Sequence, residues 1–199
     1  MFTEAESHGK LNNQNTMKED LKEIFKNVND WLKFAETKNA MLLGFNSALL
    51  VGVFKVFADD KYLKDLLIFV GPYYHYLFPI LIVISIIILL LSFIPQTKMI
   101  NLSSGDKPEK INTLFYGHLE TLTTNELLKE LGAADPEKTE GIERAYAQQI
   151  IINAGIAARK FDTFKFAGWI TISALLLVIP IIFLLGNYLK KRIGKKEIK

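Results

Sequence analysis

The chain has 199 residues, of which half are hydrophobic, and its mean hydropathy of +0.19 is high for a water-soluble enzyme. Its 24 basic and 21 acidic residues leave a net charge of +3, too small to indicate nucleic-acid binding, so neither DNA nor RNA is an expected partner. The chain has no cysteine, which excludes disulfides and thiolate sites, and its three histidines lie too far apart to share a metal, so no cofactor is expected.

The N-terminal part predicts a polar tail followed by a helix. Residues 1–15 are polar, lack the apolar core of a signal peptide and are expected to form a disordered tail. Thr16 and Glu19 have the spacing of a capping box, which predicts a cytosolic helix over residues 16–38. A first transmembrane helix is predicted over residues 39–58. Its polar Asn46 is expected to face another helix, or alternatively a water-filled gap.

The middle of the chain predicts a second span and a helical lobe. A short external loop is expected over residues 59–75, and the apolar run 76–94 predicts the second transmembrane helix. Residues 95–165 are then expected to form a cytosolic lobe. In this lobe Thr123 and Glu126 form a second capping box, opening a short helix that Gly132 closes.

A long helix is predicted to follow. Asp135 and Pro136 are typical of an N-cap and first helical position, and an apolar face with helical period continues behind them. No breaker separates Phe161 from the 24 uncharged residues 166–189, which predict a third transmembrane helix continuous with the lobe. Residues 190–199 form a tail with six basic residues.

The predicted fold is therefore an all-α integral membrane protein with three transmembrane helices. Its cytosolic lobe is formed by the N-terminal helix and the segment between spans two and three. The short loop from Asp59 to Asp65 holds three acidic and two basic residues, which favours the outside of the membrane. An odd number of spans then puts the basic tail outside, against the positive-inside tendency. Either the tail is an exception or one apolar run does not span.

Catalytic patterns are missing from the sequence, and an enzyme is not expected. There is no Ser-His-Asp arrangement, no HExxH motif and no Walker A loop. Glu120, Glu126 and Glu130 share a short segment, but such carboxylates are typical of a solvated helix face.

A binding site finds more support in the sequence, because aromatic rings and cationic or amide donors suit the base and phosphate of a nucleotide. Gly117 lies between two of the candidates, where a missing side chain would let a ligand approach the backbone. The candidate ligand-binding residues are Tyr116, His118, Arg144, Gln148, Gln149, Asn153, Arg159 and Lys160.

Structural roles compete with this interpretation. Gln149 and Asn153 would be accounted for if they only tie their helix to the helix of Trp31, and Arg159 and Lys160 if they only mark a membrane edge. Trp31, with Glu36 and Lys38, is more typical of an interfacial anchor than of a site.

Three stretches together resemble the transmembrane effectors of Pycsar antiphage systems. They are Trp31–Asn46 (WLKFAETKNAMLLGFN), Asn112–Leu119 (NTLFYGHL), and Ala147–Ile150 (AQQI) with Ile156–Phe161 (IAARKF). In the family pattern an Asp stands where this chain has Glu36, and Asn39 is a further departure. The resemblance extends over about residues 20 to 185.

The resemblance implies a function in defence. A linked nucleotide cyclase makes a cyclic nucleotide during phage infection, cyclic CMP or cyclic UMP. The effector binds it in the cytosol, assembles as a homo-oligomer and disrupts the lipid bilayer of the inner membrane. The alternative is a membrane-anchored helical scaffold that binds a protein partner without pore activity.

Overall fold

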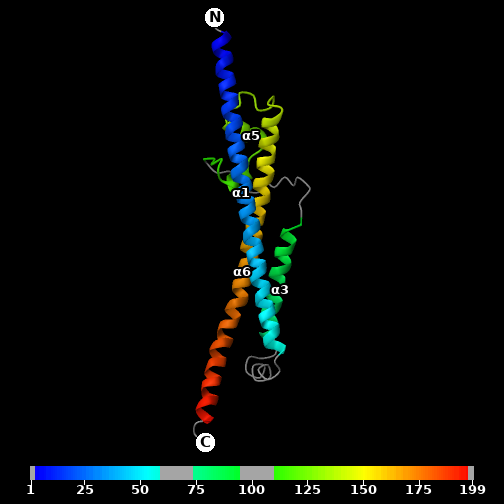
Figure 1. The fold of residues 1–199 in the computed structure, drawn as a ribbon, viewed down its shortest axis with the longest axis vertical. Coiled ribbons are helices and arrows are strands. Elements are labelled where there is room, and N and C mark those ends of the chain that lie inside the picture. The colour runs from blue at the N-terminus through cyan, green and yellow to red at the C-terminus, as the bar shows by residue number, and fades with distance from the viewer. Residues whose placement is uncertain (1–2, 59–73, 95–109, 197–199) are drawn as a thin grey trace. The chain divides into compact units, whose positions relative to one another are not determined.

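The structure is a computed structural model of the chain (Figure 1). It describes the backbone of residues 3–58, 74–94 and 110–196, and the side chains of residues 15–55, 76–94, 110–177 and 183. Every regular element in these ranges is helical, in agreement with the all-α prediction. The elements are α1 (Thr3–Ala58), α3 (Tyr74–Ser92), α4 (Tyr116–Leu119), α5 (Thr124–Glu130) and α6 (Ile142–Lys196).

Helix α1 has 56 residues and begins at Thr3, so the predicted boundary between a tail and a helix at Thr16 is wrong. The reason is that no proline precedes Pro72 and nothing in residues 3–15 stops a helix. Thr16 and Glu19 therefore lie inside a continuous helix, where the backbone N–H groups already have partners and a capping box has no role.

Helix α6 has 55 residues and is unbroken through Phe161 and Trp169, which confirms the predicted continuity. Its predicted start at Asp135 is wrong. The Asp135 carbonyl accepts hydrogen bonds from the Lys138 and Thr139 N–H groups, closing a single turn. Gly141 then takes a φ of 77°, which interrupts the helical path, and α6 begins at the next residue.

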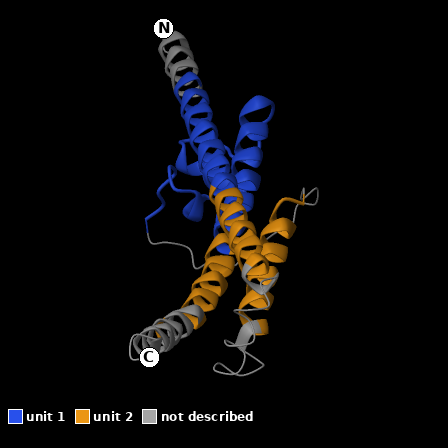
Figure 2. Cartoon of the chain, turned by 60° about the horizontal axis from the view of Figure 1, so that its bottom comes forward, with its two compact units in different colours: residues 1–37, 95–162 blue, residues 38–94, 163–199 orange. Residues whose placement is uncertain are grey.

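The chain forms two compact units (Figure 2). Unit 1 comprises residues 1–37 and 95–162, and unit 2 comprises residues 38–94 and 163–199. Both α1 and α6 contribute residues to each unit.

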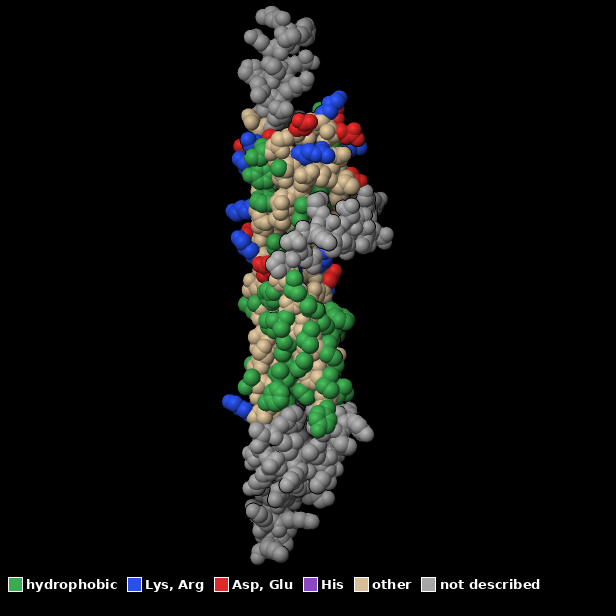
Figure 3. All heavy atoms as spheres, turned by 90° about the vertical axis from the view of Figure 1, so that its right-hand side faces the viewer, with side chains coloured by type: hydrophobic (Ala, Val, Ile, Leu, Met, Phe, Trp, Pro, Cys, Tyr) green, Lys and Arg blue, Asp and Glu red, His purple; other side chains and the backbone are tan. Residues whose placement is uncertain are grey.

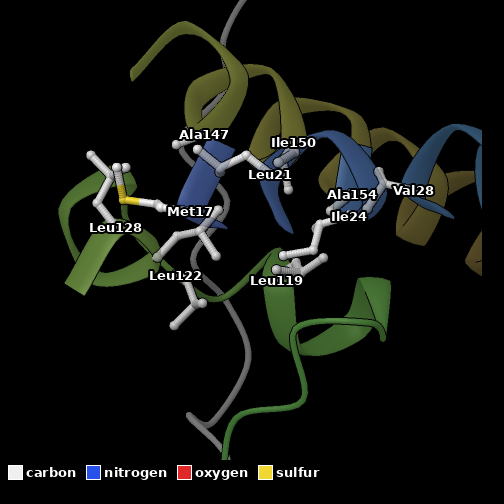
Figure 4. Close-up of a cluster of buried hydrophobic side chains, with 11 residues drawn as sticks. Met17, Leu21, Ile24, Val28, Leu119, Leu122, Leu128, Ala147, Ile150 and Ala154 are labelled. Carbon is white, nitrogen blue, oxygen red and sulfur yellow. The ribbon is translucent and has the colours of Figure 1, made fainter. Parts of the chain in front are cut away.

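Unit 1 has a hydrophobic core to which four helices contribute (Figure 4). Leu21 and Val28 of α1 are fully buried with Leu119 of α4, Leu128 of α5 and Ile150 of α6. Each fully buried aliphatic side chain stabilises the fold by about 1.5–3 kcal/mol. The short helices α4 and α5 thus have their place because α1 and α6 present apolar faces with helical period.

The predicted ends of α5 are confirmed. The Thr123 hydroxyl accepts a hydrogen bond from the Glu126 N–H, and the Glu126 carboxylate accepts one from the Thr123 N–H. After the helix, Gly132 has a φ of 83°, the left-handed conformation that ends many helices.

Unit 2 combines an apolar cluster with a polar network between three helices. Phe78 and Ile82 of α3 are buried with Ala174 of α6. Beside them Asn46 of α1 donates hydrogen bonds to the hydroxyls of Ser85 (2.9 Å) and Thr171 (3.0 Å). All three polar side chains are at most 3% exposed. Asn46 therefore links helices in this structure, as the first of its two interpretations predicts.

Large hydrophobic side chains cover the outside of unit 2 (Figure 3). Trp169 is 68% exposed, Phe54 62% and Leu91 58%. The hydrophobic residues that Figure 3 shows in green gather over this unit, whereas Lys, Arg, Asp and Glu side chains gather over unit 1.

The prediction of three transmembrane helices is wrong for the residues described. Among them no helix combines the length and the apolar character that a bilayer crossing needs. A span takes about 20 apolar residues. The first predicted span, residues 39–58, contains the polar Asn46 and Ser47 and the charged Lys55. Of the third, only residues 166–177 and 183 have described side chains, and most of the predicted loop 59–75 lies outside the described residues.

Candidate functional site

Three aromatic residues, one from each stretch that carries the family resemblance, meet in unit 1. Tyr116 of α4 stacks on Phe161 of α6, with ring centroids 4.9 Å apart and an interplanar angle of 21°. Trp31 of α1 contacts both rings, at 5.4 Å from Tyr116 and 6.1 Å from Phe161. Residues that are 130 positions apart in sequence (161 − 31) thus form one cluster, which we call the aromatic cluster.

Two further rings extend this cluster towards the surface. Phe34 lies 6.0 Å from Phe161, and Phe115 lies 4.8 Å from Tyr116. Phe34 is 47% exposed and Phe115 is 38% exposed, while Phe161 is only 8% exposed. Aromatic surface is therefore accessible at the edge of the cluster.

An ion pair joins α1 and α6 beside the aromatic cluster. The Lys160 ammonium lies 3.3 Å from a Glu36 carboxylate oxygen. The Lys160 side chain is only 13% exposed, whereas that of Glu36 is 48% exposed. The sequence grouped Glu36 with Lys38, but the Lys38 ammonium lies over the Phe164 ring, 5.3 Å from its centroid.

The segment around His118 folds on itself. The His118 Nδ1 atom accepts a hydrogen bond from the Asn112 N–H, and the Asn112 side-chain oxygen accepts one from the Leu114 N–H. The Asn27 amide of α1 donates to the Leu114 carbonyl at 2.5 Å, fixing the segment to the long helix. His118 is thereby held in place, with its ring centroid 5.2 Å from that of Phe115.

The space beside Gly117 is occupied by the Phe115 side chain. A Cβ atom at this position would lie 2.7 Å from Cε1 of Phe115. The glycine is thus needed for close approach of the Phe115 ring, and the space that the sequence suggested for a ligand is occupied.

Three of the predicted residues make contacts away from the aromatic cluster. Arg144 donates to the Asn125 side chain (3.2 Å) and to the Pro136 carbonyl (3.1 Å), holding the turn before α6. Gln149 donates to Asn153, and Asn153 donates to Asn29 of α1, each at 2.8 Å. Gln148 is exposed. The structural alternative for Gln149 and Asn153 was that they link their helix to the helix of Trp31, and the hydrogen bond from Asn153 to Asn29 makes this link.

Of the predicted set, Tyr116 belongs to the aromatic cluster, the His118 ring contacts Phe115, and Lys160 precedes Phe161 in α6 with the half-buried Arg159 before it. The structure adds Trp31 and Glu36, which the sequence had assigned to an anchor, Phe161, which it had assigned to an apolar helix face, and Phe34, to which it had assigned no role. The sequence could have pointed to Trp31, Glu36 and Phe161, because all three lie in the stretches that carry the family resemblance.

Metal ligation finds no support among the described residues, where no three His, Asp or Glu side chains come together in a way that suits an ion. The arrangement offers instead a largely buried ammonium paired with a half-exposed carboxylate, and accessible aromatic surface. These groups suit a small anion that carries a planar ring.

Comparison with known proteins gives one family. A family model described as a Pycsar effector protein domain matches residues 20–187, which is 168 of the 199 residues. No curated protein and no solved structure gives a significant match.

Proposed function

The chain belongs to the Pycsar effector family, and from that premise we propose that it binds cyclic CMP or cyclic UMP and then disrupts the bacterial inner membrane. Membership itself links the chain to antiphage defence and to a cyclic-nucleotide signal made by a cyclase. The observation that supports a binding role most directly is the meeting of Trp31, Tyr116 and Phe161 in unit 1.

The chemistry of this site fits a cyclic pyrimidine nucleotide. Lys160 offers one nearly buried positive charge for the single negative charge of a cyclic phosphodiester. The exposed parts of Phe34 and Phe115 offer ring surface, on which base stacking contributes about 1–3 kcal/mol per base.

The outside of unit 2 supports action at the bilayer. Water-soluble monomers rarely expose contiguous apolar patches larger than a few hundred Å². Unit 2 exposes Phe54, Leu91, Trp169 and several further large hydrophobic residues. Such a surface is stable against lipid or against further copies of the chain, and both partners belong to this proposal.

Calorimetry of the purified full-length chain tests the binding half. We expect cyclic CMP or cyclic UMP to bind and Lys160→Gln to weaken binding at least about tenfold, because a charge-assisted hydrogen bond contributes about 1.5–3 kcal/mol. Lys129→Gln, which changes an exposed lysine of α5 in the same unit, is the matched control and is expected to bind normally. Equal affinity of both variants would remove Lys160 from the site.

Dye release tests the membrane half. Liposomes that contain the chain are expected to leak when the cognate nucleotide is added and to stay intact with cyclic AMP. Ile87→Lys, which places a charge on the exposed face of α3, is expected to reduce leakage, while Leu114→Lys on unit 1 is not. Tight capture of a protein partner without any nucleotide-dependent leakage would support the scaffold alternative instead.

A further inference from the structure

We propose that Glu36 is an internal competitor for the anion site: it neutralises Lys160 in the ligand-free chain, and a monoanionic phosphodiester replaces it there. This inference rests on the proposed function, because the phosphodiester is that of the cyclic nucleotide. It adds a statement about regulation, namely that ligand binding requires the Glu36–Lys160 ion pair to open.

The burial of the two partners is unequal, and that inequality decides which one leaves. The Lys160 side chain is 13% exposed and belongs to α6 next to the buried Phe161. A largely buried ammonium favours a nearby counter-charge, because it has lost part of its own hydration. Glu36 is 48% exposed, so its carboxylate is already half-hydrated and loses little when it turns into water. Lys160 stays in place and its counter-ion is the replaceable member.

Charge balance sets the kind of anion that fits. A carboxylate and a phosphodiester each carry one negative charge, so the exchange leaves the net charge around Lys160 unchanged. Inorganic phosphate carries between one and two negative charges at pH 7 and has no ring to place on Phe34 or Phe115. The same site is therefore selective for a phosphodiester attached to a planar base.

The exchange changes a contact between two helices. Glu36 and Lys160 are 124 residues apart in sequence (160 − 36), and their pairing holds α1 against α6 within unit 1. Once a ligand pairs with Lys160, this link is lost and Glu36 is released. The ion pair then acts as an autoinhibitory contact, which lowers the apparent affinity of the resting chain for its ligand.

Glu36→Gln tests the competition, because it removes the charge and keeps the side-chain size. We expect this variant to bind cyclic CMP or cyclic UMP about fivefold more tightly than the wild type, the factor that corresponds to about 1 kcal/mol. Asp30→Asn is the matched control, since Asp30 is an exposed acid of α1 that pairs with Lys33, and it is expected to leave affinity unchanged. Inorganic phosphate is expected to bind at least about tenfold more weakly than the nucleotide to both chains.

A second variant excludes a general loss of structure. Lys160→Gln combined with Glu36→Gln removes both charges of the pair, so it is expected to fold normally by circular dichroism and to bind the nucleotide at least about tenfold more weakly than the wild type. If the wild type binds and Glu36→Gln binds equally or more weakly, the competition is overturned while the proposed function stands. If phosphate binds as tightly as the nucleotide, the inference of a selective phosphodiester site is overturned. If no chain binds either cyclic nucleotide, the proposed function and the inference both fail.

Discussion

Unit 1 and unit 2 are built on stretches of the same two long helices, yet they sort their side chains in different ways. In unit 1, Leu21, Leu127 and Leu128 are fully buried, and charged residues cover the surface. In unit 2, Asn46 and Ser85 are fully buried, while Phe54 and Trp169 are more than 60% exposed. Both units use the same two long helices, so the difference lies in the side chains of each stretch and in what those side chains contact.

This comparison explains how each unit is held together. Apolar burial gives unit 1 its stability, because transfer of leucine from water is favourable. An apolar exterior leaves unit 2 less to gain from hydrophobic burial, and directional hydrogen bonds between Asn46, Ser85 and Thr171 fix the relation of its helices. Such networks specify register, since a helix that slides breaks every bond at once.

The largest effect is expected from the core of unit 1. Leu128→Ala should lower the free energy of unfolding by about 3 kcal/mol, because it removes buried methyl groups and leaves a cavity. Urea denaturation followed by Trp31 fluorescence in a Trp169→Phe background measures it. Leu114→Ala is the control, since Leu114 is 52% exposed, and a similar loss there would contradict the distinction between core and surface.

The polar network of unit 2 should give the next largest effect. Asn46→Val removes the hydrogen bonds to Ser85 and Thr171 and should destabilise the chain by about 1–2 kcal/mol, measured by thermal unfolding with circular dichroism. Both hydroxyls keep a contact with the Ala167 carbonyl, which limits the loss. Ser47→Ala, the exposed neighbour, should change little, and a stabilised Asn46→Val would show that unit 2 is held by apolar packing alone.

A smaller effect is expected where the aromatic cluster meets Gly117. Gly117→Ala should cost about 1 kcal/mol in thermal unfolding, because the Phe115 ring must move away from the new methyl group. The ring is partly exposed and has room to do so. Gly155→Ala, in α6 with no atom within 4 Å of the added carbon, should instead raise stability by up to about 1 kcal/mol. A gain in stability of the same size at both sites would exclude the close approach.

The smallest effect concerns the surface of unit 1. The hydrogen bond to Lys138 lowers the pKa of the Asp135 carboxyl below its ordinary value of 3.8. A lowered folded-state pKa means that the pair contributes stability above the ordinary pKa and loses it as the pH falls through the folded value. Lys138→Ala should raise the pKa of Asp135, measured by a carboxyl NMR titration, with hardly any change in unfolding because the pair is exposed. An unchanged titration would exclude Lys138 as the cause.

The prediction of helix ends and of helix continuity succeeded where a few neighbouring residues decide the backbone conformation. The spacing of Thr123 and Glu126 determines a cap, Gly132 ends the helix, and the absence of breakers makes α6 continuous. The prediction of helix starts failed at α1, where no residue breaks the helix before Thr16, and at α6, where the helix-breaking effect of Gly141 was overlooked. Residues 3–15 continue α1 because nothing stops them, and Gly141 delays the start of α6 beyond Asp135.

By itself, the sequence determined that the chain is helical, which helix faces are apolar, and which stretches carry the family resemblance. The periodicity of an apolar face says that the face is buried but not against what, because hydrophobic burial has no direction. Only the tertiary structure decided that Trp31, Tyr116 and Phe161 share one cluster and that Glu36 pairs with Lys160. It also decided that Asn46 meets Ser85 and Thr171. Such contacts between distant residues depend on distances of a few ångströms, which the relative position and rotation of packed helices set.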